Sequence, residues 1–345
     1  MKKAGLLLLL YLFLLMAACQ PAATAQPKGI STSVQPPVEM QVKEIPLAGP
    51  AANPNAELSG MAWYADWLVL LPQYPHRFSS GTDGALLAIP KVEILAFLDG
   101  RSNLPLTPRL VPLTAPGIRE LPGFEGFEAI AFEGNSLYLT IEASPGSMLA
   151  YLVKGEVTGD LASIRLDTQT VSKITPRLNM ANMSDEALLI LGDQIATFDE
   201  ANGAGLNPAP MAHLFNADLG FAGDSTLPSI EYRITDATAL DGQNRFWVMN
   251  YFFPGDTQLA VTSDPLFQKY GRGRTHSQST PVERLVELQW SQDHFSLVDR
   301  APIQLQLIEH NTARNWEGLV RLDDLGFLAA TDSFPNTILG FIAIP

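Results

Sequence analysis

Cysteine is almost absent from this sequence: the chain of 345 residues contains a single one, Cys19, close to its amino terminus. A lone cysteine cannot form a disulfide within the chain, so the fold depends on packing and not on covalent cross-links. Histidine is nearly as scarce, with five copies, and no Cys-x-x-Cys, His-Glu-x-x-His, Gly-x-Ser-x-Gly or P-loop motif occurs. Zinc sites and phosphate-binding glycine-rich loops are therefore not expected.

Positive charge is also in short supply. The sequence has 22 Lys and Arg residues against 36 Asp and Glu residues, which gives a formal net charge of −14. Two of the cations, Lys2 and Lys3, fall in the leader described below, so the rest of the chain carries −16. This balance argues against nucleic acid or an anionic membrane surface as the main partner. It suits a secreted protein, and it suits the binding of cations.

Helical periodicity is the third missing feature. After residue 20, no segment places its apolar residues at helical spacing more clearly than at strand spacing. Glycine and proline are plentiful, with 26 copies each, as expected where many short strands are joined by turns. The composition and the pattern together predict an all-β fold.

The amino terminus resembles the leader of bacterial lipoproteins. Lys2 and Lys3 precede an apolar segment, residues 6–16, that is too short to span a bilayer comfortably, and Leu-Met-Ala-Ala-Cys follows. The resemblance implies a signal peptide over residues 1–18, cleavage before Cys19 and a lipid on its thiol. Anchoring by this lipid implies an extracytoplasmic lipoprotein, on the cell surface or in the periplasm. The alternative is an ordinary signal peptide that happens to contain a cysteine.

The segment that follows has the composition of a flexible tether. Residues 20–38 consist mainly of Ala, Pro, Ser, Thr and Gln, which cannot bury enough apolar surface to fold. We expect the tether to run over residues 19–41. A single folded domain is then expected over residues 42–345.

A hairpin pattern of 14-residue step recurs in this domain. Each copy reads polar oxygen side chain, Gly or Ala, apolar run, turn, apolar run, polar oxygen side chain. The copies are residues 59–73, 128–142, 186–200, 236–250 and 317–332, the last being one residue longer. The apolar runs have the length of a typical strand, and Gly, Asn and Asp between them are turn residues. The two ends of each copy are expected to lie across from one another in an antiparallel hairpin.

The repeat predicts a β-propeller of four-stranded antiparallel blades. Further strands follow each hairpin, for example at residues 84–90 and 92–98 after the first. We expect five blades, with six as the alternative if the longest unit hides a degenerate blade. An isolated strand at residues 42–47 is expected to complete the last blade beside the apolar carboxyl terminus. The polar, Gly-rich insertion at residues 254–281 is predicted to be a loop over one face.

Four short motifs carry a resemblance to a known family. Leu-Ser-Gly-Met-Ala, Phe-Glu-Ala-Ile-Ala, Ile-Thr-Asp-Ala-Thr-Ala-Leu and Asn-Trp-Glu-Gly-Leu-Val occur in this order. The domain resembles the phytase-like (esterase-like activity of phytase) propeller domain over about residues 42–345. The resemblance implies hydrolysis of phosphate or carboxylic esters. The sequence departs from the pattern of alkaline phytases, because Asp-Ala-x-Asp-Asp-Pro-Ala is absent and Ser59 and Gln73 replace the acidic pair of the first hairpin.

The ends of the repeated hairpins are the candidate site. All offer oxygen, which is the ligand that Ca²⁺ prefers. The expected ligands are drawn from a set of six, namely Glu128, Glu186, Asp236, Asn250, Glu317 and Asp332. The alternative is that these side chains only cap backbone amides. Glu142 or Glu200 would serve as the general base.

Basic residues near the same ends are candidates for binding an anionic ester. They are His76, Arg77, Arg272, Arg274 and Arg314, with solvated loop charges as the alternative. The main hypothesis is thus a Ca²⁺-dependent ester hydrolase acting on a small molecule at the channel mouth. A non-catalytic propeller that binds a ligand or protein of the cell envelope is the alternative, and a purely structural envelope component is a third.

Overall fold

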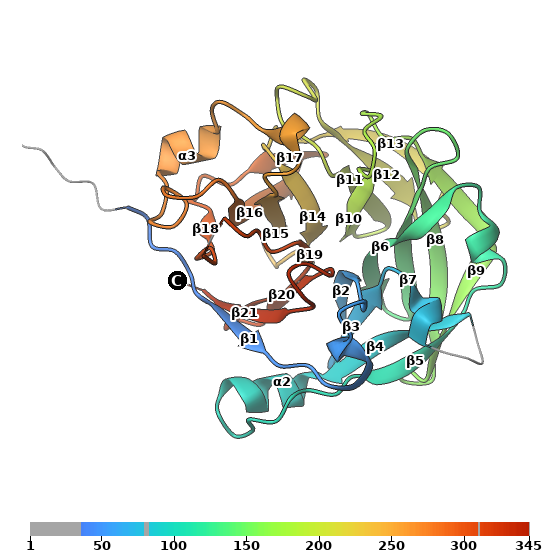
Figure 1. Cartoon of the computed structure of the whole chain (residues 1–345). Helices are drawn as coiled ribbons and strands as arrows, with labels where there is room; N and C mark the ends of the chain where they lie inside the picture. Colours follow the sequence, from blue (N-terminus) through green and yellow to red (C-terminus); the bar gives the residue numbers. More distant parts are fainter. Residues whose placement is uncertain (1–35, 79–82, 310, 345) are drawn as a thin grey trace, which may run out of the picture. The chain divides into compact units, whose positions relative to one another are not determined.

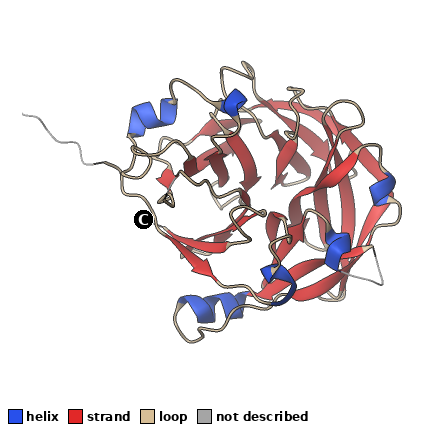
Figure 2. Ribbon diagram, viewed as in Figure 1, coloured by secondary structure: helices blue, strands red, loops and turns tan. Residues whose placement is uncertain are grey.

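Antiparallel strands make up most of the chain, which confirms the expected all-β class (Figures 1 and 2). The computed structural model describes residues 36–78, 83–309 and 311–344, and they belong to one compact unit, Pro36–Pro345. The predicted signal peptide, Cys19 and most of the tether lie outside the described residues. Within the described residues, no helix has the length and apolar character needed to cross a membrane.

The described strands form five units of four, which we number along the chain (Figure 1). Unit 1 contains β2 (Leu58–Tyr64), β3 (Trp67–Pro72), β4 (Gly84–Pro90) and β5 (Arg109–Thr114). Unit 2 contains β6 (Phe124–Glu133), β7 (Ser136–Ala143), β8 (Leu149–Thr158) and β9 (Ser163–Ile174). Unit 3 contains β10 (Asp185–Leu191), β11 (Gln194–Asp199), β12 (Met211–Asn216) and β13 (Phe221–Thr226).

The last two units close the arrangement. Unit 4 contains β14 (Arg233–Ala237), β15 (Arg245–Phe252), β16 (Val282–Ser291) and β17 (His294–Leu297), with the short β18 (Ile303–Gln304) also paired to β16. Unit 5 contains β19 (Trp316–Leu322), β20 (Gly326–Thr331), β21 (Leu339–Ala343) and, from the other end of the domain, β1 (Val42–Ile45). The antiparallel pairing of β1 with β21 confirms that the first strand completes the last unit.

The first strand of each unit lies innermost. These inner strands are β2, β6, β10, β14 and β19. Each contacts the next, and β19 contacts β2, so the five form a closed ring. Within the described residues, a buried hydrophobic cluster lies between each pair of neighbouring units, including units 5 and 1. Both faces of each sheet are therefore covered, which explains why the strands are apolar on both sides. This arrangement is a propeller-like fold.

Units 1 and 2 are less separate than the repeat suggests. Their outer strands, β5 and β9, make a short parallel contact through Leu113 with Ile164 and Thr114 with Arg165. The two sheets therefore continue into one another at the periphery.

The prediction of a strand at residues 92–98 is wrong. The segment forms the helix α2 (Lys91–Leu98), outside the ring of strands (Figure 2). Pro90 precedes it as the N-cap residue, and of the helix only Ile94 is fully buried. Leu95, Phe97 and Leu98 pack against the core while staying partly exposed. A run with one fully buried residue does not need the two-sided burial of a central strand, and the fourth strand of unit 1 is β5 instead.

The long insertion also contains more structure than a loop. It includes η4 (Thr257–Leu259) and the helix α3 (Pro265–Tyr270), whose N-cap Asp264 accepts hydrogen bonds from two backbone amides. The other 3₁₀ turns of the domain are η1 (Gly49–Ala52), η2 (Pro75–Phe78) and η3 (Ile118–Glu120). Glu39, within the expected tether, accepts hydrogen bonds from Thr275 and His276 of this insertion. Residues 39–41, expected to belong to the tether, therefore belong to the folded domain.

Candidate functional site at the start of the inner strands

Each inner strand contains a β-bulge at its beginning. The extra residue interrupts the register between the first and second strand of every unit. The bulged residues are Ser59, Glu128 (with Ala129), Glu186, Thr235 and Glu317. A bulge bends the strand and redirects a side chain. Because the five inner strands form a ring, the bulges bring these side chains toward one another at one end of it.

The second strands supply the other side chains at this end. In each second strand, the relevant residue comes directly after the one that pairs with the last inner-strand residue before the bulge. These residues are Gln73, Glu142, Glu200, Tyr251 and Asp332. Four of the five are the ends of the repeated hairpins, as expected. Glu142 is not opposite Glu128 as predicted, because the bulge and a second irregularity place it opposite Gly126.

Unit 4 departs from the predicted register. Asn250 pairs with Ile234, and Asp236 pairs with Met249. The expected Asp236–Asn250 pairing is therefore wrong. The physical reason is a longer turn between β14 and β15, which Asp241 stabilises by accepting hydrogen bonds from its own loop. At this end of the ring, Thr235 and Tyr251 occupy the places that the repeat assigns to Asp236 and Asn250.

Asp236 and Asn250 have structural contacts instead. The Asp236 carboxylate accepts hydrogen bonds from the amides of Ala237 (2.8 Å) and Leu319 (2.6 Å), which ties unit 4 to unit 5. Asn250 donates to the carbonyls of Glu231 and Arg233, and its Oδ1 accepts from Arg284. For these two residues the capping alternative describes the structure better than the metal-ligand expectation.

The remaining carboxyl groups influence one another strongly, and we call them the acidic cluster. Its members are Glu128, Glu142, Glu186, Glu200, Glu317 and Asp332. Burial, followed by the charge of Glu200, raises the pKa of Glu142 to about 8. Burial also raises the pKa values of Glu128, Glu186 and Glu317 well above their usual range, with further contributions from other members of the cluster.

Arg233 is the cation that faces this cluster, and the sequence analysis missed it. Its Nη1 pairs with Oε1 of Glu200, and its Nε donates to Oδ2 of Asp256 at 2.8 Å. It counteracts the raised pKa values of Glu142, Glu186 and Glu317. A signal for it existed: an arginine at the beginning of a strand with a fully buried pattern needs a buried partner.

Several carboxylate oxygens of the cluster have no hydrogen-bond donor within the described residues. They are Oε1 of Glu142, Oε2 of Glu186, Oε2 of Glu200 and Oδ1 of Asp332, all buried. Unpartnered oxygen ligands are chemically suited to a hard cation such as Ca²⁺. Across residues 36–78, 83–309 and 311–344, however, no three His, Cys, Asp or Glu side chains form a ready metal-binding group. The oxygen donors suit Ca²⁺, but among the described residues too few carboxylates converge to form its coordination shell.

Three of the five basic residues expected to bind an anion have side-chain contacts elsewhere. Arg314 is buried, and its Nε donates to Glu283 at 2.8 Å. Arg77 pairs with Glu57 at 2.7 Å and lies over the ring of Tyr74. Arg272 lies over the ring of Phe267, and the Arg274 carbonyl accepts from Ser277. Burial and the neighbouring Arg119 lower the pKa of His76, which disfavours its cationic form.

A second buried network lies in unit 3, also missed from the sequence. Asp185 Oδ1 accepts from Thr197 at 2.6 Å and lies 3.0 Å from Nδ1 of His213. Burial alone would lower the pKa of His213, but the hydrogen bond and charge of Asp185 raise it. Burial and Asp185 raise the pKa of the adjacent Asp199 to about 8. This network joins the three innermost strands of unit 3.

Comparisons with known proteins leave the family open. No protein-family model and no curated protein matches the sequence. A GH43_1 enzyme from Xanthomonas citri has a TM-score of 0.48 at 9% identity, over 87% of this chain and 90% of that one. An exo-beta-1,3-galactanase from Phanerochaete chrysosporium has a TM-score of 0.47 at 7% identity, over 88% of this chain and 64% of that one. The aldose sugar dehydrogenase from Escherichia coli has a TM-score of 0.45 at 10% identity, over 88% of this chain and 99% of that one. Likenesses at this level assign no activity, and the resemblance to phytase-like domains stays a prediction.

Proposed function

We propose that this protein is an extracytoplasmic, lipid-anchored hydrolase of carboxylic esters whose active site is the acidic cluster. One observation carries the proposal: several mutually repelling carboxyl groups, with unpartnered oxygens, surround Arg233 at one end of the ring. Groups that burial and like charges perturb in this way are characteristic of acid–base sites. A pKa of about 8 lets Glu142 exchange a proton near neutral pH.

The two candidate catalytic residues have different surroundings. The ion pair with Arg233 opposes the rise that burial causes in the pKa of Glu200, whereas burial and the charge of Glu200 raise the pKa of Glu142 to about 8. Carboxyl groups whose environments differ in this way can divide the work of base and acid. In the proposal, Glu142 takes the proton of the attacking water and returns it to the leaving alcohol. Glu200 and Arg233 form the ion pair beside it.

Ca²⁺ remains part of the proposal as the cation that compensates the cluster. Glu128, Glu186, Glu317 and Asp332 are the residues that would hold it. When bound, it would polarise the ester carbonyl and lower the cost of keeping these carboxylates ionised. Asp236 and Asn250 are left out because their polar atoms are already hydrogen-bonded.

A neutral ester fits the cluster better than a phosphate ester. Three of the five basic residues expected to attract phosphate, Arg77, Arg272 and Arg314, have other partners. A phosphate would therefore meet a surplus of carboxylates, which repels it. Uncharged carboxylic esters are therefore the expected substrates.

The test is hydrolysis of p-nitrophenyl acetate and p-nitrophenyl phosphate by the domain, with Ca²⁺ and with EDTA. We expect turnover of the acetate alone, reduced at least about 100-fold in Glu142→Gln, the range over which a general base contributes. Glu133→Gln is the matched control, because Glu133 is exposed at the far end of β6, the strand that pairs with β7 and its Glu142. Equal rates in all three proteins would refute the role of the cluster. Calorimetry that detects no Ca²⁺ binding would remove the cation from the proposal.

The alternative is a non-catalytic propeller that binds a ligand of the envelope. The observation that favours it is a large cavity at the other end of the inner strands, which contains no member of the acidic cluster. Absence of turnover with both esters, together with ligand binding at that cavity, would support this alternative.

A further inference from the structure

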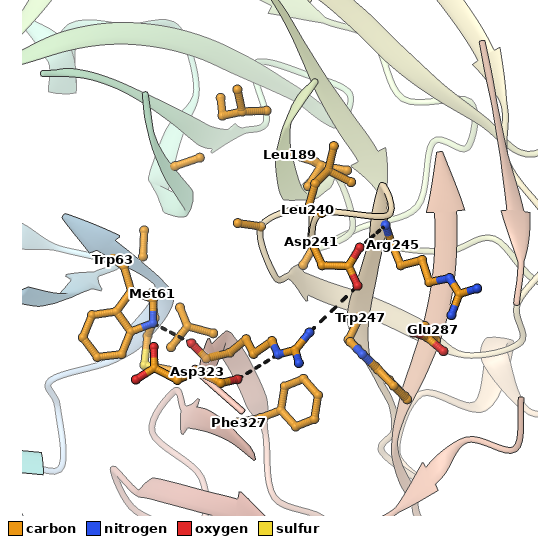
Figure 3. Close-up of a pocket in the computed structure, with 18 of the residues that line it drawn as sticks. Met61, Trp63, Leu189, Leu240, Asp241, Arg245, Trp247, Glu287, Asp323 and Phe327 are labelled. Carbon is orange, nitrogen blue, oxygen red and sulfur yellow. Dashed lines mark hydrogen bonds and ion pairs between the residues drawn. The ribbon is translucent and has the colours of Figure 1, made fainter. Parts of the chain in front are cut away.

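A cavity of about 1020 Å³ lies where the inner strands end, away from their bulged beginnings (Figure 3). All five inner strands contribute to its lining, through positions that follow the bulged residue along each strand. Examples are Met61 of β2, Ile130 of β6, Leu188 of β10, Ala237 of β14 and Val320 of β19. Its volume is at the upper end of the range for small-molecule sites, about 300–1,000 Å³.

The walls of the cavity are apolar and partly aromatic. Trp63, Trp247 and Phe327 project toward it from three different strands (Figure 3). Small side chains such as Ala62 and Ala131 leave room between them. Aromatic and aliphatic walls of this kind favour the apolar body of a ligand, because its burial releases water from both surfaces.

The mouth of the cavity is charged, but its charges are balanced. Nη2 of Arg321 lies 3.1 Å from Oδ1 of Asp324, and its Nη1 lies 3.9 Å from Oδ2 of Asp241 (Figure 3). The backbone carbonyl of Arg321 accepts a hydrogen bond from the indole of Trp63 at 2.8 Å. These contacts hold the arginine beside the cavity.

Two further ion pairs complete the balance. Lys91 pairs with Asp323 at 2.5 Å, and Arg300 pairs with Glu287 at 3.0 Å. Burial raises the pKa of Glu287, and the charges of Arg300 and of Arg245, another lining residue, oppose this rise. Four cations thus face four carboxylates around the opening. A charged ligand would have to break or crowd these pairs, whereas a neutral ligand would leave them in place.

We propose that this cavity binds an uncharged amphiphile, with its apolar body between the aromatic walls and a hydroxyl or ester group at the charged mouth. The inference does not depend on the proposed hydrolase activity. It places a ligand site at the end of the ring opposite to the acidic cluster. A hydroxyl at the mouth can donate to Asp241 or accept from Arg321 without displacing either ion pair.

A matched series of eight-carbon probes tests the proposal on the folded domain. The probes are 1-octanol, octanoate and octyltrimethylammonium, each kept below its solubility limit or micelle concentration. Binding is followed by the tryptophan emission of the protein, since Trp63 and Trp247 line the cavity, and by the shift in the thermal unfolding midpoint. We expect saturable binding of 1-octanol, at least about tenfold tighter than that of either charged probe.

Substitutions in the cavity locate the binding. Ala131→Phe fills the space from β6, and Trp63→Ala removes one aromatic wall that is only half-buried. Both are expected to weaken 1-octanol binding at least about tenfold. Ala162→Phe makes the same change as the first at an exposed turn of the same unit and is expected to bind like the original protein.

Three results would overturn the proposal. They are no saturable binding of 1-octanol, equal or tighter binding of a charged probe, and undiminished binding by the cavity variants. Circular dichroism establishes that each variant is folded, and if Ala131→Phe does not fold, Trp63→Ala decides alone. Glu142→Gln is expected to keep 1-octanol binding even where hydrolysis is lost, so the failure of one proposal is distinguishable from the failure of the other.

Discussion

Replacing Glu142 by glutamine should make the stability of this protein less sensitive to pH. Glu142 is buried, and its Oε1 has no hydrogen-bond donor among the described residues. Burial and the charge of Glu200 raise the pKa of its carboxyl to about 8. Glutamine is close in shape to the protonated acid and carries no charge, so it removes the ionisation while keeping the packing.

The sign of the effect follows from the direction of the shift. Between about pH 4.5, the ordinary value, and about pH 8, the folded protein keeps a proton on Glu142 that the unfolded chain releases. Raising the pH through this window therefore favours unfolding. A pKa raised from 4.5 to about 8 corresponds to a loss of at most about 5 kcal/mol in the free energy of unfolding.

The assay is urea unfolding of the domain at about pH 5 and about pH 9, in EDTA so that no divalent cation replaces the proton. Near pH 5, the substituted and original proteins should differ by less than about 1 kcal/mol, the scale of one hydrogen bond. Near pH 9, Glu142→Gln should be the more stable by up to about 5 kcal/mol. Glu133→Gln, at an exposed position of the same hairpin, should follow the original protein. A difference between Glu142→Gln and the original that stays constant with pH would refute the reasoning.

Three other substitutions test the contacts around the site by the same unfolding assay. Arg233→Met leaves two carboxylate partners without their cation and should cost about 3–5 kcal/mol near pH 8 and less at acidic pH; a pH-independent cost would contradict the pairing. His213→Leu should cost more near pH 6 than near pH 9, because its raised pKa makes the charged pair with its aspartate stabilising below pH 6.5 and lost as the pH rises through the folded value. Gly60→Ala should cost about 1–3 kcal/mol, since its new Cβ would lie 2.9 Å from the carbonyl oxygen of Glu128. Gly242→Ala, with open space around it, is the control, and an equal effect of both would remove the argument from close packing.

The strands, the turns and the pairing of the first strand with the last could be predicted from the sequence because they depend on patterns within short segments. Apolar runs of strand length alternate with turn residues such as Gly134 and Gly192, and residues that must be buried on both faces show it in their composition. The same patterns placed Glu128, Glu186 and Glu317 near the beginning of inner strands, where the structure has them. The segment at residues 92–98 misled because a short apolar run is compatible with a helix as well as with a strand.

By itself, then, the sequence determined the all-β class, the five hairpins, the pairing of the first strand with the last, and the end of the ring where carboxylates gather. Only the tertiary structure decided which side chains meet there. A longer turn shifts unit 4, so that Thr235 and Tyr251 replace Asp236 and Asn250, and Arg233 becomes the counterion of the cluster. The cavity at the other end was also invisible in the sequence. The grouping of side chains in the acidic cluster and the cavity both arise from contacts between residues far apart along the chain. Cross-strand register and bulges determine these contacts, and local sequence patterns do not.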